Sequence, residues 1–332
     1  MVQLYVEKLK NGLIRQFMCA GKLRILEKSI LTSDTIQFII TLLRHPIVEK
    51  YPLRTSYLVV IIRMLSKQVE IEEHQVCDHD IAYMYCRYAR FMLPQPAGPI
   101  FYKHYILDDD IDLKPGLTID SVITIQETAT FVSDGTTGLC TWEAGVALGV
   151  WALRNKEKLQ GKFIVELGSG TGLSGISACV NCKPRKYWFT DCHAGVLDVI
   201  KNNIDINDMV HTFNCPYEVI KLPWENVQRS ERFDEEKPDL ILAADVIYDR
   251  TMFESLCTSL KYFAANNTTE IILFSTVRNP ETHQKFLETL ERFYLEFTEE
   301  ILPDNYSMII EQNSPIHITN IKKRNVNTYY TF

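Results

Sequence analysis

The run FIVELGSGTGLSG, residues 163–175, joins an apolar segment to a series of glycines. The apolar residues at 163–167 predict a β-strand, and those after the glycines predict a helix that continues through Cys179. Glycines at such a turn adopt positive φ angles and let a ligand approach the backbone closely. The helix that follows presents free N–H groups at its start. The run therefore predicts a strand, a ligand-binding turn and a helix.

Two classes of cofactor fit this glycine turn. Residues 170–175 match the GxGxxG fingerprint of dinucleotide-binding proteins, and Asp191 follows about twenty residues later, as a ribose-binding carboxylate should. The strand also carries Glu166, followed by GxGxG at residues 168–172, and this order resembles the first motif of S-adenosylmethionine methyltransferases. A sulfonium cofactor has no pyrophosphate and needs close backbone approach and nearby acids. We therefore favour S-adenosylmethionine, with a nicotinamide dinucleotide as the alternative.

The segments after this run alternate between strand and helix patterns. Further strands are predicted at residues 187–190, 217–222, 240–246 and 270–276, followed by two antiparallel edge strands within 294–301 and 307–322. The strand at 240–246 is almost wholly apolar, which is typical of a central parallel strand that is buried on both faces. The alternation predicts an α/β fold with a Rossmann-like, doubly wound sheet.

Two regions precede this sheet. Residues 1–93 carry apolar side chains at helical spacing and are predicted to form an N-terminal helical region. The breaker sequence at residues 94–99 ends that region. Residues 100–130 are predicted to form a short β-rich connection. Residues 131–332 then form the cofactor-binding domain.

The composition limits the partners and the compartment. The formal net charge of −7 argues against direct binding of nucleic acid, so a protein or small-molecule substrate is favoured. The nine cysteines follow no disulfide framework, and no signal peptide or membrane-spanning run is recognised, which predicts a cytoplasmic protein with reduced thiols. Cys179 and Cys182 have zinc-ligand spacing but lack a second pair, so no metal site is predicted.

Polar and aromatic residues stand at the carboxyl ends of the predicted strands, where open α/β sheets bind ligands. Asp191 can accept both ribose hydroxyls of a cofactor or cap the helix that follows. Trp224 can pack on an adenine face or in the core. Asp245, after a very apolar strand, is predicted to lie beside the reactive methyl group, with Tyr248 in the next turn. The alternative for Asp245 is a buried acid bonded to backbone.

The segment after the fourth strand also separates substrate classes. N6-adenine methyltransferases carry Asp/Asn-Pro-Pro-aromatic at this place, where their prolines shape a base pocket. This chain has Val246 and Ile247 instead, which counts against a base amine as the acceptor. The order Asp-x-x-Tyr resembles the lysine methyltransferases of the superfamily.

Four further segments, together with the glycine turn, resemble one family over nearly the whole chain. They are DGTTGLCTWEA at 134–144, DCH at 191–193, AADVIY at 243–248 and TVRNPET at 276–282. They resemble the eukaryotic elongation factor 2 lysine methyltransferases, which belong to the seven-β-strand class I protein-lysine N-methyltransferase family. The resemblance implies a seven-strand class I methyltransferase sheet, S-adenosylmethionine as the methyl donor, and a lysine of translation elongation factor 2 as the acceptor.

The resemblance also assigns the site residues by position. With Glu166 from the glycine motif, the cofactor-binding residues are Trp142, Glu166, Gly168, Ser169, Gly170, Asp191, Trp224 and Ala244. Asp245 and Tyr248 are implied to be catalytic, with the carboxylate orienting the lysine amine and the ring forming a wall of its channel. Glu143 stands where aspartate is commoner in the family. The alternatives are a different protein substrate, a dinucleotide-dependent oxidoreductase, or a non-catalytic binding module of the same fold.

Overall fold

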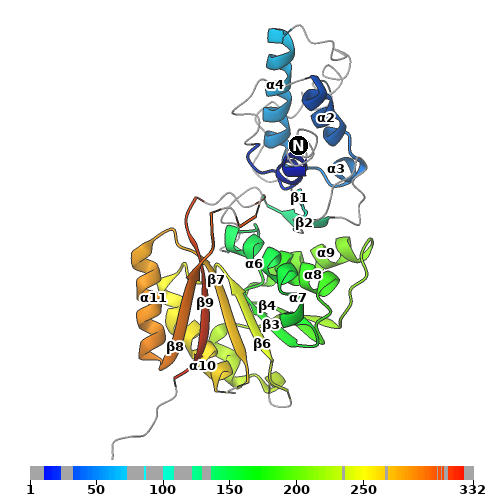
Figure 1. The fold of residues 1–332 in the computed structure, drawn as a ribbon. Coiled ribbons are helices and arrows are strands. Elements are labelled where there is room, and N and C mark those ends of the chain that lie inside the picture. The colour runs from blue at the N-terminus through cyan, green and yellow to red at the C-terminus, as the bar shows by residue number, and fades with distance from the viewer. Residues whose placement is uncertain are drawn as a thin grey trace, which may run out of the picture. The chain divides into compact units, whose positions relative to one another are not determined.

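The chain forms two compact units, Met1–Ser133 and Asp134–Phe332 (Figure 1). The computed structural model describes residues 11–23, 33–72, 86, 100–107, 122–128, 136–233, 236–265, 268–304, 306–307, 309 and 313–324. The predicted breaker at residues 94–99 lies outside these described residues. Among the described helices, none combines the length and the apolar character that crossing a membrane requires.

The second unit contains a seven-stranded sheet in the order β5-β4-β3-β6-β7-β9-β8. The strands are β3 (Phe163–Leu167), β4 (Lys186–Asp191), β5 (Tyr217–Lys221), β6 (Leu240–Ala244), β7 (Glu270–Thr276), β8 (Leu295–Ile301) and β9 (Ile316–Lys323). All neighbouring pairs are parallel except those made by β9, which is antiparallel to β7 and β8. The predicted Rossmann-like seven-strand sheet is confirmed. Strand order reverses between β3 and β6, where such sheets bind ligands.

Two strand ends differ from the sequence-based prediction by more than one residue. Strand β6 ends at Ala244 because Asp245 takes a φ of 52°, which leaves the extended conformation. Strand β9 begins at Ile316, nine residues after the predicted start at Ser307. Pro315 directly precedes it and has no N–H to donate to the ladder, although its carbonyl accepts the N–H of Val277 at 2.8 Å.

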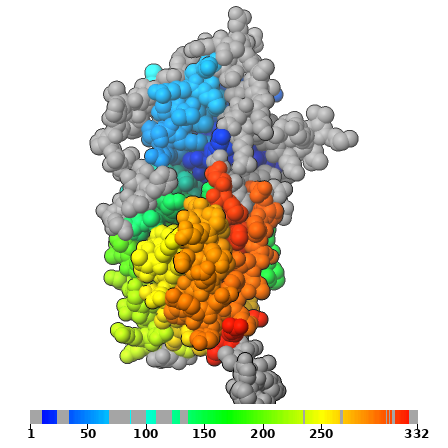
Figure 2. Space-filling model, turned by 90° about the vertical axis from the view of Figure 1, so that its left-hand side faces the viewer, coloured from blue at the N-terminus to red at the C-terminus, as the bar shows by residue number. Residues whose placement is uncertain are grey.

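Helices cover both faces of the sheet (Figure 1). One face is covered by α6 (Glu143–Arg154), the short α7 (Lys156–Leu159), α8 (Leu173–Asn181) and α9 (Ala194–Asp208). The other is covered by α10 (Phe253–Ala264) and α11 (Pro280–Arg292), which Figure 2 shows in yellow and orange. Because side chains alternate along a strand, Val165 joins the apolar core beneath α10 and α11, whereas its neighbour Glu166 faces α8.

The close approach of α8 to β4 depends on Gly175. A Cβ at this position would overlap the ring of Phe189 and lie 2.7 Å from Cε1 of Tyr187. The third glycine of the GxGxxG pattern therefore serves helix–strand packing, a role it has with either cofactor.

We expect Gly175→Ala to lower the free energy of unfolding by about 1–3 kcal/mol, the usual cost of forcing a methyl group into a packed core. Gly145→Ala is the matched control, because its Cβ would meet only Cγ2 of Thr141 at 3.8 Å. Urea unfolding monitored by circular dichroism measures both variants. Equal midpoints for the two would contradict the packing role.

The first unit combines helices with a two-stranded sheet. Residues 11–18 are helical, followed by α2 (Ser33–Leu43), α3 (Pro46–Lys50) and α4 (Thr55–Glu72), and the strands are β1 (Phe101–Tyr105) and β2 (Ile123–Glu127). Helix α3 begins directly after His45, whose ring accepts the N–H of Ile47 at 3.2 Å. The described helices of this unit share one apolar core, which also includes Ile106 and Val122 beside the two strands.

Candidate active site

A cavity of about 430 Å³ lies at the carboxyl ends of β3, β4 and β6. Its wall is built from the glycine turn after β3, the residues that follow β4 and β6, the 3-10 helix η3 (Trp224–Arg229) and the start of α6. All ten residues that the sequence analysis selected line this cavity: Trp142, Glu166, Gly168, Ser169, Gly170, Asp191, Trp224, Ala244, Asp245 and Tyr248. The fold thus brings together residues that span more than a hundred positions of the sequence.

The glycine turn has the backbone conformation that the sequence predicts. Gly168, Gly170 and Gly172 have φ angles of 66°, 54° and 84°, a region that side-chain-bearing residues rarely adopt. A Cβ at Gly168 would also press against Cγ1 of Val246 at 3.0 Å. Ser169 ties the turn to β4, because its hydroxyl accepts the N–H of Thr190 at 3.0 Å. The glycine turn is therefore fixed with its backbone facing the cavity.

Glu166 brings a buried carboxyl group to the cavity wall. The hydroxyl of Ser174 donates a hydrogen bond to Oε1, while Oε2 has no hydrogen-bond partner among the described residues. Burial raises the pKa of Glu166 from its ordinary value of 4.5 to about 7, against the hydroxyl groups of Ser174, Tyr187 and Ser169, which lower it. An unpartnered oxygen on an acid that ionises near neutrality suits a cationic amine.

The raised pKa predicts a pH dependence of stability. Below about pH 4.5 the acid is protonated in both the folded and the unfolded chain, and between pH 4.5 and about 7 only the folded chain keeps the proton. The stability that this proton contributes, on the order of 3 kcal/mol, is lost progressively as the pH rises from about 4.5 to about 7. We expect the free energy of unfolding of the ligand-free protein, measured in urea from pH 5 to 8, to fall relative to that of Glu166→Gln. Parallel pH profiles would contradict this assignment.

Asp191 and Trp224 occupy neighbouring parts of the wall. Asp191 Oδ1 accepts the N–H of His193 at 3.0 Å, and burial raises the pKa of this carboxyl group. His193 is the N-cap residue of α9, and its side chain makes no capping hydrogen bond. The Asp191 carboxylate thus bonds to a backbone N–H in the turn between β4 and α9. Cζ2 of Trp224 lies 3.8 Å from the position that a Cβ of Gly168 would take, which places the indole beside the glycine turn.

Asp245 is held by two segments that are distant in sequence, the start of α6 and the end of β7 with the residues that follow it. Its Oδ1 accepts the N–H of Thr276 at 2.8 Å, and its Oδ2 accepts the Thr276 hydroxyl at 3.0 Å and the N–H of Ala144 at 3.3 Å. Arg278 Nη2 lies 3.5 Å from Oδ2, and only 8% of the Asp245 side chain is exposed. Burial raises the pKa of Asp245, and Arg278 and the hydrogen bonds lower it. The φ of 52° is strained for a residue other than glycine.

Arg278 contacts Trp142 of the cavity wall and the acids Glu143 and Asp245, and it is not among the site residues predicted from the sequence. Its guanidinium carbon lies 4.8 Å from the centre of the Trp142 ring, and Nη2 lies 3.4 Å from Oε2 of Glu143. Trp142 in turn donates from Nε1 to the carbonyl of Thr137 at 3.0 Å. The only sign of this role in the sequence is the position of Arg278 within the segment TVRNPET.

A second cavity, of about 230 Å³, shares Asp245 and Tyr248 with the first. Its other lining residues come from the end of β7, the segment that follows it and the first turn of α11, together with Ile247. The Tyr248 side chain stands in the turn after β6 and is 63% exposed. The two shared residues are the pair that the sequence analysis assigned to the acceptor lysine.

A family model described as lysine methyltransferase matches residues 120–293. The chain belongs to this family. Membership confirms the predicted enzyme class and, with it, S-adenosylmethionine as the methyl donor, so the dinucleotide-dependent oxidoreductase is set aside.

Curated relatives extend the match beyond the family segment. The human protein-lysine N-methyltransferase EEF2KMT is 29% identical over 86% of this chain and 88% of its own length. The human protein FAM86B2, a protein N-methyltransferase by provisional assignment, is 30% identical over 82% of this chain and 80% of its own length. A calmodulin-lysine N-methyltransferase of Arabidopsis thaliana is 27% identical over 65% of this chain and 66% of its own length.

Proposed function

We propose that this lysine methyltransferase modifies translation elongation factor 2, with S-adenosylmethionine in the larger cavity and the acceptor lysine in the smaller one. The choice of substrate is supported by the segments that resemble the elongation factor 2 enzymes and by the similarity to human EEF2KMT. The negative net charge also suits a cationic acceptor.

One observation carries this proposal: Asp245 and Tyr248 line both cavities. Transfer of a methyl group requires donor and acceptor to be held in line at close range, and such positioning supplies a large part of the rate. Because Asp245 and Tyr248 line both cavities, a donor in the larger cavity and an acceptor in the smaller one would be held next to each other. The larger cavity also fits the donor, since it offers an unpartnered carboxylate oxygen at Glu166 and a glycine backbone that a Cβ would obstruct.

We assign the donor contacts from the geometry of the wall. The open backbone at Gly168, Ser169 and Gly170 borders the amino-acid portion of the donor, and Glu166 accepts its ammonium group. Asp191 accepts the ribose hydroxyls with the oxygen that His193 does not occupy. Trp224 packs on the adenine, while Trp142 and Ala244 complete the wall.

When bound, S-adenosylmethionine supplies a sulfonium methyl group, which the neutral lysine amine takes by displacing the sulfur. Lysine has a reference pKa of about 10.4, so the amine must lose a proton before it attacks. Asp245 is already fixed by Thr276 and Ala144, and in this proposal its Oδ2 orients the amine. Tyr248 forms the wall of the lysine channel, and its ring attracts the cation.

Tyr248 provides a test that separates its ring from its hydroxyl group. We expect Tyr248→Phe to keep most of the turnover, because the ring still forms the channel wall. Tyr248→Ala is expected to lose activity roughly tenfold or more, chiefly through a higher KM for the protein substrate, on the scale of a lost cation–π contact. Steady-state kinetics with both variants measure this difference, and calorimetry with S-adenosylhomocysteine is the control. Equal loss in both variants would assign the role to the hydroxyl.

The substrate is tested by methylation of purified elongation factor 2, read by mass spectrometry of its lysines. The same measurement on elongation factor 2 from cells with and without this protein shows whether the modification depends on it. Another protein substrate is the second candidate, because one relative is named for calmodulin. Methylation of calmodulin, or of other lysate proteins, with elongation factor 2 unmodified would replace the first substrate by the second.

A further inference from the structure

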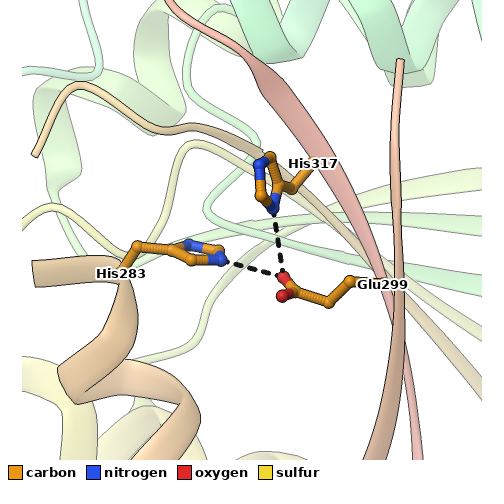
Figure 3. A group of neighbouring side chains, drawn as sticks. All are labelled: His283, Glu299 and His317. Atoms are coloured by element: carbon orange, nitrogen blue, oxygen red, sulfur yellow. Dashed lines mark hydrogen bonds and ion pairs between the residues drawn. The ribbon is translucent and has the colours of Figure 1, made fainter. Parts of the chain in front are cut away.

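Three side chains from three elements meet behind the smaller cavity, in the unit spanning Asp134–Phe332. They are His283 on α11, Glu299 on β8 and His317 on β9, and Figure 3 shows both rings directed at the same carboxylate oxygen. His283 Nε2 lies 2.9 Å and His317 Nδ1 lies 3.5 Å from Glu299 Oε1. One ligand atom from each of the three side chains lies within 4.8 Å of the others.

The strand register explains why these residues share one face. Glu299 is the partner of Thr319 across the β8–β9 ladder, and His317 stands two residues before Thr319 and so points the same way. Helix α11 brings His283 over this face in its first turns, and the two imidazole centroids are 4.8 Å apart. The Thr319 hydroxyl donates to Glu299 Oε1 at 3.0 Å, which holds the carboxylate in place.

The cluster is partly buried and incompletely hydrogen-bonded. The side chains of His283, His317 and Glu299 are 9%, 16% and 21% exposed. His317 Nδ1 is buried and has no hydrogen-bond partner among the described residues, although it points at the carboxylate. A buried ring nitrogen without a hydrogen-bond partner is costly, and a cation bound by this nitrogen between the three groups would remove that cost.

We propose that His283, Glu299 and His317 bind a zinc ion. Two imidazoles and one carboxylate form a ligand set that zinc takes in proteins, with water in the fourth position. Zinc bonds of about 2.0–2.1 Å in a tetrahedron separate neighbouring ligand atoms by roughly 3.3 Å. The distances of 2.9 and 3.5 Å to Glu299 Oε1 lie on either side of this spacing. The two histidine nitrogens, which lie within 4.8 Å of each other, would move closer together on binding the ion.

The three proposed zinc ligands are distinct from Asp245 and Tyr248, the residues assigned to methyl transfer. His283 also lines the smaller cavity, so a zinc ion would anchor the first turns of α11 to the sheet edge beside the proposed lysine channel. No short sequence motif indicates the zinc site, because its ligands are 16 and 18 residues apart on three elements.

The test is a titration of the metal-free, reduced full chain with zinc chloride against a chromophoric chelator. We expect one equivalent to bind and to raise the unfolding temperature, since a ligand that binds only the folded state stabilises it. His317→Gln and Glu299→Gln should each weaken this binding roughly a hundredfold or more. His211→Gln, a histidine in the turn after α9, is the matched control and should keep wild-type affinity. Wild-type affinity and stoichiometry in both cluster variants would overturn the proposal.

Two further measurements cover misfolding and thiol ligands. Calorimetry with S-adenosylhomocysteine reports whether each variant still folds, independently of zinc and of the protein substrate. The chain has nine cysteines, which also bind zinc. X-ray absorption of the zinc-loaded wild-type protein counts nitrogen or oxygen and sulfur neighbours without any variant. Only nitrogen and oxygen neighbours are expected, and a sulfur shell would overturn the site even if the variants failed to fold.

Discussion

Asp245→Asn is expected to lower the turnover of lysine methylation roughly a hundredfold or more, the scale of a positioned catalytic group. The substitution keeps the size of the side chain but removes its charge. It also replaces one acceptor oxygen by an amide that cannot accept the N–H of Ala144 or Thr276. Arg278 would then lack its buried counter-charge. Both effects disturb the group that we assign to orienting the amine.

Binding measurements separate this loss from a loss of the cofactor site. Calorimetry with S-adenosylhomocysteine should change by less than about tenfold, because the assigned donor contacts come from Asp191 and the glycine turn. Thr276→Val is the matched control, since it removes one hydroxyl donor to Asp245 and leaves the carboxylate and the Thr276 N–H bond. We expect its turnover to fall much less. A folded Asp245→Asn enzyme with unchanged turnover would show that this acid has only a structural role.

Gly170→Val is expected to weaken S-adenosylmethionine binding at least roughly a hundredfold, or about 2.7 kcal/mol. Gly170 has a φ of 54°, which a β-branched residue adopts only at high cost. Its side chain would project where the glycine turn borders the cavity, and the Cβ alone would stand 3.6 Å from the carbonyl of Gly138. Isothermal calorimetry with the methyl donor or its demethylated product measures the effect.

Gly161 supplies the control for this second prediction. It has a φ of 70°, and a Cβ there would meet nothing within 4 Å. Gly161→Val therefore imposes similar backbone strain away from the cavity, and it should lower the unfolding temperature without changing the affinity for the cofactor. If both variants lost binding equally, unfolding and not obstruction of the cavity would be the cause.

The sequence predicts the sheet well where a strand is continuous and apolar. The predicted limits of β3 and β7 agree with the structure, since each strand is almost entirely buried and its apolar run ends at a turn. The end of β6 and the start of β9 were misplaced because tertiary contacts decide them. The bonds of Asp245 to β7 and to the start of α6 hold the backbone out of the strand. The local sequence pattern gives no information on contacts between residues that are distant in the chain.

The same difference between local sequence pattern and tertiary contact applies to the residues of the candidate active site. Residues at strand ends could be selected from the sequence, because parallel strands place their carboxyl ends at one edge and the ten chosen residues line one cavity there. Arg278, Thr276 and the N–H of Ala144 were missed because their significance lies in contacts with Asp245, which is distant in sequence. The cluster of His283, Glu299 and His317 was missed for the same reason.

The contacts of Asp245 also bear on when the enzyme becomes competent during its synthesis. The residues that hold its carboxylate stand 101 positions before and 31 positions after it. A chain emerging from the ribosome presents the glycine turn, Asp191 and Trp224 well before Thr276 appears, and domains fold as units once their sequence is available. A nascent or truncated chain that ends before Thr276 therefore contains every assigned donor contact but lacks an ordered acceptor carboxylate. Such fragments should be inert toward lysine, and competence arises late, after most of the catalytic unit has been translated.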